Sequence, residues 1–286
     1  MHSRIAYRKM TKAKKILFVT QEMLPFVPET DLAQMGRFLP QAVQDKSREI
    51  RSFMPKWGTI NERRNQLHEV IRLSGMNIVV DDTDHPLVIK VASITAARMQ
   101  IYFIDNDDFF VGRNMAMDAT GKEYEDNAER AAFFARGVLE TIKKLKWSPD
   151  IIHCLGWMSS FLPLYIKTAY TEEPSFRDCK VIYTPSSEAL TSPIPANIDG
   201  IIAFRGATIS AIRGLGEKKL LPMLNKLGIK YADGIGFQTD NEELQKYAEG
   251  LGKPCQLPVS IEDYGINYPA FYDTVWNIGR VEEEEE

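Results

Sequence analysis

The chain has 286 residues, of which 44% are hydrophobic and 26% are charged, as in a globular protein that buries a core. Its formal net charge of −4 argues against nucleic-acid binding, and no apolar run reaches the roughly 18 residues that a membrane span needs. Three cysteines without close spacing argue against a disulfide framework or a zinc site, so the reducing cytoplasm is the expected compartment.

Predicted strands and helices alternate along most of the chain. Short apolar runs between turn signals predict buried strands over residues 15–20, 49–54, 150–154, 180–184 and 233–238. Apolar residues at helical spacing predict helices over residues 31–46, 126–146, 157–170, 216–228 and 240–250. At the start of the second helix, Asp126 and Glu129 have the spacing of a capping box.

The region 69–104 differs from the rest because it contains three β-rich runs. They are separated by Gly75 and by the turn signal DDTDHP. The acidic residues of that signal and His85 are the one candidate metal cluster, but such segments beside proline are usually turns. We therefore expect no metal and no cofactor.

This order of elements predicts an α/β fold. It would be a Rossmann-like, doubly wound, mostly parallel sheet with a β-rich insertion. Ligands of such sheets bind at the carboxyl ends of the strands. The loops in which to expect a site are those that follow the strands at 15–20, 99–104, 150–154 and 180–184.

Five separated blocks of sequence occur together in the order and spacing of one known family. They are ILFVTQEMLPF, REIRSFMPKWG, IYFIDNDDFF, DNAERAAFFARGVLE and SPDIIHCLGWMSSFLPLYIK. Through them, roughly residues 14–245 resemble the N-terminal domain of bacterial glycogen synthases and plant starch synthases, the retaining glycosyltransferases of family 5. The likeness is closest to short proteins of Bacteroidetes-type bacteria that carry the same family label.

The resemblance implies one half of a GT-B fold, in which two Rossmann-like domains face each other across a cleft. Such enzymes transfer glucose from ADP-glucose to the non-reducing end of an α-1,4-glucan without a metal. The N-terminal domain mostly shapes the acceptor side, and the C-terminal domain grips the nucleotide.

The loop after the first strand departs from the family pattern. The family carries Lys-x-Gly-Gly-Leu-Ala-Asp there, and its glycines and lysine receive the donor diphosphate. Here Pro28 replaces the lysine, Thr30 and Asp31 replace the glycines, and Gln34 replaces the aspartate. Carboxylates at a helix N-terminus stabilise the helix and disfavour a bound anion. We therefore expect that the loop keeps its shape and that the anion site is closed.

At two other positions the chain also lacks polar residues that the family has on the donor side of its site. Leu155, Gly156 and Trp157 stand where the family has His-Asp-Trp, whose histidine contacts the transferred glucose. The segment 185–187 (PSS) lacks a second family histidine. His153 matches an earlier histidine of the family and is interpreted as a strand-end histidine with satisfied nitrogens rather than as a replacement catalyst.

No catalytic residue is assigned. The resemblance places a residual sugar site, if one is kept, among Glu22, Asp105, Asn106, Asp126, Asn127 and His153. Aromatic platforms for sugar stacking could come from Trp57, Tyr102, Phe110 and Trp157, although core packing is the more ordinary role of such residues.

Three parts of the chain are expected. Residues 1–14 form a basic tail without the apolar core of a secretory signal, and residues 15–250 form the synthase-like domain. Residues 251–286 form an extension that ends in the acidic run VEEEEE. By analogy with GT-B proteins, its aromatic segment at 262–277 returns to pack on the domain.

The altered donor positions and the short extension favour a module that binds an α-glucan, a related sugar or a partner protein. Such a module has no glucosyltransferase activity alone. One alternative is half of a split ADP-glucose:α-1,4-glucan glucosyltransferase, whose C-terminal domain is a separate chain. A transferase that acts by itself is the least favoured reading. Oligomerisation as a homodimer, through the face that meets the second domain in the family, is a further expectation.

Overall fold

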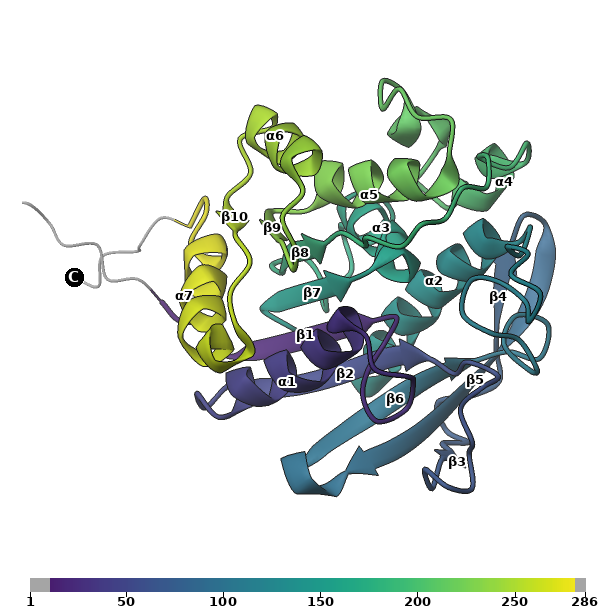
Figure 1. Ribbon diagram of the computed structural model, residues 1–286, viewed down its shortest axis with the longest axis horizontal. Coiled ribbons are helices and arrows are strands. Elements are labelled where there is room, and N and C mark those ends of the chain that lie inside the picture. The colour runs from purple at the N-terminus through teal and green to yellow at the C-terminus, as the bar shows by residue number, and fades with distance from the viewer. Residues whose placement is uncertain (1–10, 281–286) are drawn as a thin grey trace, which may run out of the picture.

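The computed structural model describes residues 11–280, and Figure 1 shows its arrangement. Most of the basic tail (1–10) and the acidic run (281–286) lie outside the described residues. The strands are β1 (Lys15–Thr20), β2 (Glu49–Pro55), β3 (His68–Glu69), β4 (Met76–Val80), β5 (Thr83–Ile94), β6 (Met99–Asp105), β7 (Ile151–Leu155), β8 (Lys180–Thr184), β9 (Gly234–Gly236) and β10 (Cys255–Gln256). The helices are α1 (Asp31–Gln44), α2 (Asn127–Leu145), α3 (Phe161–Thr168), α4 (Ile198–Ile202), α5 (Leu220–Tyr231), α6 (Glu242–Gly250) and α7 (Tyr264–Trp276).

The strands form one sheet in the order β10-β9-β8-β7-β1-β2-β6-β5-β3, and β4 pairs with β5. From β10 to β6 the neighbours are parallel, and β1 lies in the centre with every residue after Lys15 buried. The insertion adds antiparallel strands β3, β4 and β5 at the edge next to β6. The predicted α/β fold with a mostly parallel sheet and a β-rich insertion is therefore confirmed.

Helices cover both faces of the sheet. On one face, α2, α3 and α5 contribute to the larger apolar core. On the other face, α1 and α7 pack side by side and form a second core with Phe18 and Ile151 (Figure 1). The aromatic segment at 262–277 thus forms a helix that contacts the domain, as Tyr268 and Tyr272 are fully buried against the sheet.

The predicted helix at 157–170 and the predicted turn at 81–86 differ from the structure in their bounds. The segment 157–170 consists of a short 3-10 turn, Trp157–Ser159, and the separate helix α3. In the turn signal, only Asp81 and Asp82 form the turn between β4 and β5, with φ of 46° and 62°. Between residues 11 and 280, no three His, Cys, Asp or Glu side chains are grouped so as to hold a metal ion. In the same range, none of the helices has the length and apolarity to cross a bilayer.

Candidate ligand site at the carboxyl edge of the sheet

The loops that follow β1, β7 and β8 meet at one edge of the sheet. The backbone N–H of Gln21 donates to Leu155 O at 3.2 Å, and that of Gly156 donates to Thr184 O at 3.0 Å. The indole of Trp57, after β2, donates to Gln21 O at 2.7 Å. These bonds hold the ends of four strands together, and ligands of parallel α/β sheets bind at this edge.

The start of α1 is closed by side chains of the chain itself. Thr30 is the N-cap: its hydroxyl oxygen accepts from Ala33 N at 2.9 Å and donates to a carboxylate oxygen of Glu22. Pro28 and Asp31 are exposed beside it. The Gln34 amide donates to Glu29 at 2.6 Å, so the replaced aspartate position now binds a neighbouring carboxylate. An anion at this helix end would lie among carboxylates instead of an ammonium.

A bridge of two carboxyl groups and one amide lies beneath the helix start. The amide nitrogen of Gln21 donates to Glu22 Oε1 at 3.1 Å and to Glu188 Oε1. Glu22 is 4% exposed and its other oxygen accepts from Thr30, whereas Glu188 Oε2 is buried without a hydrogen-bond partner. Burial, followed by the charge of Glu22, raises the pKa of Glu188 to about 7. A carboxyl group with this pKa holds a proton in part of the molecules at neutral pH.

Gly156 and Gln21 share one small space. Gly156 has φ of 83°, and a Cβ at this position would lie 2.3 Å from Gln21 Oε1. That oxygen accepts from Met158 N at 3.4 Å. The side chain of Gln21 therefore occupies the room that a residue larger than glycine would need, and a His-Asp-Trp arrangement does not fit this backbone. Leu155 and Trp157 are both fully buried.

His153 lies inside the protein, away from any ligand at the edge. One ring nitrogen is 2.7 Å from the Tyr272 hydroxyl and the other is 2.8 Å from Thr184 Oγ1. The side chain is fully buried, and burial lowers its pKa to about 3. Both nitrogens of His153 therefore have partners, as expected, but the residue lies in the middle of β7 and not at its end.

The two residues at the end of β6 hold the chain itself. Asp105 is 2% exposed and forms an ion pair with Lys90 at 2.8 Å. The amide of Asn106 donates to Pro86 O at 2.9 Å, and its oxygen accepts from the N–H groups of the next loop. Both side chains therefore position the loop that follows rather than point into open space.

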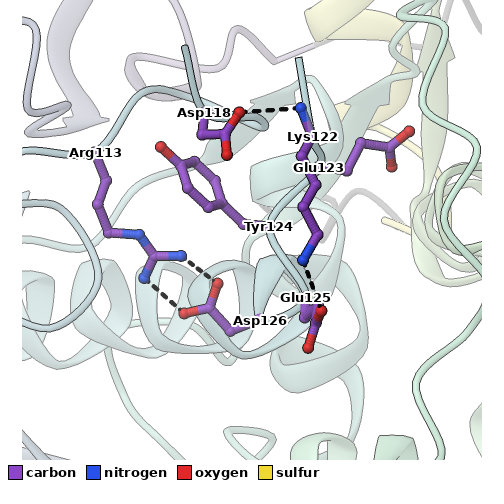
Figure 2. Close-up of a pocket in the computed structure, with 7 residues that line it drawn as sticks. All are labelled: Arg113, Asp118, Lys122, Glu123, Tyr124, Glu125 and Asp126. Carbon is purple, nitrogen blue, oxygen red and sulfur yellow. Dashed lines mark hydrogen bonds and ion pairs between the residues drawn. The ribbon is translucent and has the colours of Figure 1, made fainter. Parts of the chain in front are cut away.

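Asp126 lines an open pocket of about 290 Å³ on the loop between β6 and α2 (Figure 2). The guanidinium of Arg113 binds both oxygens of Asp126, with a distance of 2.7 Å to Oδ2, and lies 4.3 Å from the ring centroid of Tyr124. Lys122, Glu123 and further acidic side chains complete the lining. The expected capping box is wrong: Asp126 precedes α2 without a side-chain cap because its carboxylate pairs with Arg113.

Arg130 supports this pocket from behind and was missed by the sequence analysis. It is fully buried, and its guanidinium donates to the carbonyls of Phe109 (3.0 Å), Met115 (2.6 Å) and Asn114 (2.8 Å). It also donates to Asn127 Oδ1 at 2.9 Å, so Asn127 belongs to the support and not to the lining. An arginine four residues before Phe134, on the apolar stripe of a helix, was the available signal.

The expected aromatic platforms are parts of the core. Trp57, Phe110 and Trp157 are fully buried and Tyr102 is 7% exposed, so none presents a face to a sugar. The aromatic residue at the pocket is Tyr124, whose hydroxyl accepts from Asn114 N at 3.1 Å. Its ring is partly exposed.

Known proteins resemble this chain over most of its length. Residues 15–251 match the family model described as the starch synthase catalytic domain. Glycogen synthase of Chlorobium limicola is 39% identical over 171 residues, which are 59% of this chain and 35% of the relative. Glycogen synthase of Pelodictyon phaeoclathratiforme is 37% identical over the same length. The chain thus spans about a third of the length of the curated relatives it matches.

Among solved structures, the fold matches the catalytic domain of starch synthase IV from Arabidopsis thaliana bound to ADP and acarbose. The TM-score is 0.68 at 16% identity, and the match covers 88% of this chain and 53% of that one. This likeness concerns the fold, which is that of one half of a GT-B glycosyltransferase. From the family match over residues 15–251, the chain belongs to the starch synthase catalytic domain family.

Proposed function

We propose that this domain binds α-glucan at the carboxyl edge of its sheet and that residues 15–250 hold no donor nucleotide. The observation that carries the proposal is the start of α1. Thr30 caps the helix there, the carboxylate of Glu22 lies beneath, and Glu29 and Asp31 flank it. A diphosphate at a helix N-terminus needs free N–H groups and positive charge, whereas here Thr30 takes one of the N–H groups and the flanking side chains are carboxylates.

The pocket beside Tyr124 supports the sugar-binding part of the proposal. Its lining combines a guanidinium, carboxylates and a partly exposed aromatic ring. Such groups donate to and accept from sugar hydroxyls, and the ring provides a surface for the C–H face of a pyranose. The buried guanidinium of Arg130 fixes the loop behind, so the lining is held in place before a ligand arrives.

Isothermal titration with maltoheptaose, ADP and ADP-glucose tests the proposal. We expect maltoheptaose to bind and Tyr124→Ala to weaken it by about tenfold, or ~1.4 kcal/mol. Tyr247→Ala, a partly exposed tyrosine on α6 outside the pocket, is the matched control. ADP and ADP-glucose should give no heat above dilution. Binding of ADP-glucose at micromolar affinity would contradict the proposal that the start of α1 does not bind a diphosphate.

A second candidate is half of a split or longer transferase, and the match to about a third of the length of its relatives favours it. In that case a GT-B C-terminal domain, on this or another chain, would supply the nucleotide site. Glucosyl transfer to maltoheptaose that appears only after such a domain is added would support this candidate. We place either function in the cytoplasm, since all three cysteines are free thiols.

A further inference from the structure

A second pocket lies where β2 and its neighbour β6 begin, at the end of the sheet opposite to the carboxyl edge. Its volume is about 230 Å³, and its lining includes Gln44, Glu49, Arg51, Arg98, Gln100 and Tyr102. It shares no lining residue with the Tyr124 pocket. We refer to it as the Arg98 pocket.

The register of the sheet brings part of this lining together. Phe53 on β2 lies opposite Tyr102 on β6, and their rings stack at 4.8 Å between centroids. Since side chains alternate along a strand, Arg51 and Gln100, each two residues earlier, lie on the same face of the sheet. Arg98 joins them from the turn before β6, where its φ is 51°.

Neither arginine of the pocket has a carboxylate partner. Within residues 11–280, the exposed side chain of Arg98 forms no ion pair or hydrogen bond. In the same range Arg51 forms no ion pair, and its guanidinium makes one hydrogen bond, to the Tyr102 hydroxyl at 3.0 Å. Most arginine donors of this pocket are therefore available to an anion, which would also offset the repulsion between two like charges.

Arg51 is held in place by its neighbours. Its guanidinium lies over the ring of Trp147, 5.0 Å from the centroid, and the indole N–H of Trp147 donates to Glu49 Oε1 at 2.6 Å. The N–H groups of a guanidinium lie in its plane, so stacking on an aromatic ring leaves them able to donate. A side chain that is fixed in this way loses little freedom when it binds a ligand.

The number of donors favours a phosphate over a carboxylate. A carboxylate has two oxygens, which one guanidinium fork can saturate, whereas a phosphate monoester has three terminal oxygens that two arginines can share. Glu49 adds one negative charge to the lining, which leaves the pocket with a net charge of about +1 and still favours an anion. The Glu49 carboxylate is also partly engaged by Trp147.

The pocket has room for more than the anion. A water molecule takes about 30 Å³ in the liquid, so 230 Å³ exceeds the space that a phosphate group alone requires. The remaining lining offers neutral and acidic oxygens, those of Gln44, Gln100 and Glu49. Such oxygens accept hydrogen bonds from hydroxyl groups.

We propose that the Arg98 pocket binds a small hydroxylated phosphomonoester. The guanidinium groups of Arg51 and Arg98 donate to the phosphate oxygens, and the amide of Gln100 donates to the same group. The oxygens of Gln44 and Glu49 accept from hydroxyls on the rest of the molecule. This site goes beyond the glucan pocket and does not depend on it.

Isothermal titration of the full chain in a low-salt buffer without phosphate tests this site. The probes are inorganic phosphate and glycerol phosphate, and we expect glycerol phosphate to bind with a Kd of about 0.1–1 mM. Arg98→Gln should weaken this binding at least about tenfold, because it removes a charged donor. Arg64→Gln is the matched control: it removes the same charge from an exposed arginine outside the pocket and should change nothing.

A second variant tests the geometry of the site and not only its charge. Arg51→Lys keeps the positive charge but loses the planar fork, and it should weaken glycerol phosphate binding about fivefold or more. Arg98 makes no side-chain contact that Arg98→Gln could break, so that variant should keep the parent's circular dichroism and urea midpoint. The result for Arg98→Gln therefore stands even if Arg51→Lys loses stability.

Three results would overturn the proposal. The first is the absence of heat with both inorganic phosphate and glycerol phosphate. The second is binding of glycerol phosphate that Arg98→Gln does not alter. The third is binding of glycerate as tight as that of glycerol phosphate, which would make the pocket a carboxylate site. Tyr124→Ala should leave glycerol phosphate binding unchanged, and Arg98→Gln should leave maltoheptaose binding unchanged, so failure of one proposal is distinguishable from failure of the other.

Discussion

The imidazole of His153 on β7 lies 2.7 Å from the hydroxyl of Tyr272 on α7, and its other nitrogen lies 2.8 Å from Thr184 Oγ1 on β8. This chain of contacts joins the last helix to the middle of the sheet. Tyr272 and Thr184 are both fully buried, so neither nitrogen can exchange its partner for water. Residue 272 is thus part of the core although it lies beyond the stretch that matches the family.

We expect Tyr272→Phe to lower the free energy of unfolding by about 1–3 kcal/mol, because it leaves a buried imidazole nitrogen without a partner. Urea denaturation followed by circular dichroism gives this value. Tyr247→Phe on the surface of α6 is the control and should stay within about 0.5 kcal/mol of the parent. Equal urea midpoints for the two variants would show that the hydrogen bond between Tyr272 and His153 does not stabilise the protein.

His153 should make the protein sensitive to acid. Its pKa is about 3 in the folded state and near its ordinary value of 6.5 when unfolded, so below pH 6.5 only the unfolded state takes up the proton. Stability from this group is full above pH 6.5 and falls as the pH drops towards 3, by up to about 1.4 kcal/mol per pH unit. His153→Gln, which does not titrate, should flatten this slope in denaturation curves measured from pH 7 to 4. An unchanged slope would contradict the prediction.

Glu188 should have the opposite effect on the pH dependence of stability. Its pKa is about 7 in the folded state against an ordinary value of 4.5, so the folded state holds the extra proton. Stability from this group is full below pH 4.5 and is lost as the pH rises to 7. Between pH 4.5 and 6.5 the two groups therefore oppose each other. Glu188→Gln should steepen the rise of stability with pH in this window, and a shallower rise would refute the assignment.

Gly156 and Gln21 should be energetically coupled. Gly156→Ala should lower the free energy of unfolding for two reasons. The backbone at this position has φ of 83°, which is strained for alanine, and the new Cβ would lie against Gln21 Oε1. Each effect costs about 1–3 kcal/mol. Gln21→Ala in the same chain should restore the part due to the clash and not the part due to backbone strain. A double-mutant cycle should then give a coupling of about 1–3 kcal/mol. Additive effects would mean that the two side chains do not compete for space.

Local patterns were sufficient to predict the elements that build the sheet. The strand at 15–20 and the strand at 180–184 match β1 and β8, because a short apolar run between turn signals leaves few alternatives. The cap of α1 is local in the same sense, because Thr30 accepts from Ala33 N, three positions further along the chain. Such features are decided within one turn or one strand.

The parts of the site that the sequence left open depend on contacts between distant residues. Asp126 fits a local capping box, but Arg113 competes for its carboxylate. The bridge from Gln21 to Glu188 spans 167 positions, and nothing in either local sequence indicates the other partner. Arg130 reads as one polar residue of a helix until the loop around it supplies its carbonyls. Pairings of this kind require the fold to be known first.

The described ends of the chain are neighbours. Thr11 donates from its backbone to Asn277 Oδ1 at 3.2 Å, and Ala13 donates to Asp273 Oδ1 at 2.9 Å. Arg48 binds the other oxygen of Asp273 at 2.7 Å and closes the junction. A short linker between these two ends, with a new opening in an exposed loop such as 118–121, should therefore give a circular permutant that folds in the same way. The arrangement of the strands in the sheet would then not depend on where the chain begins and ends.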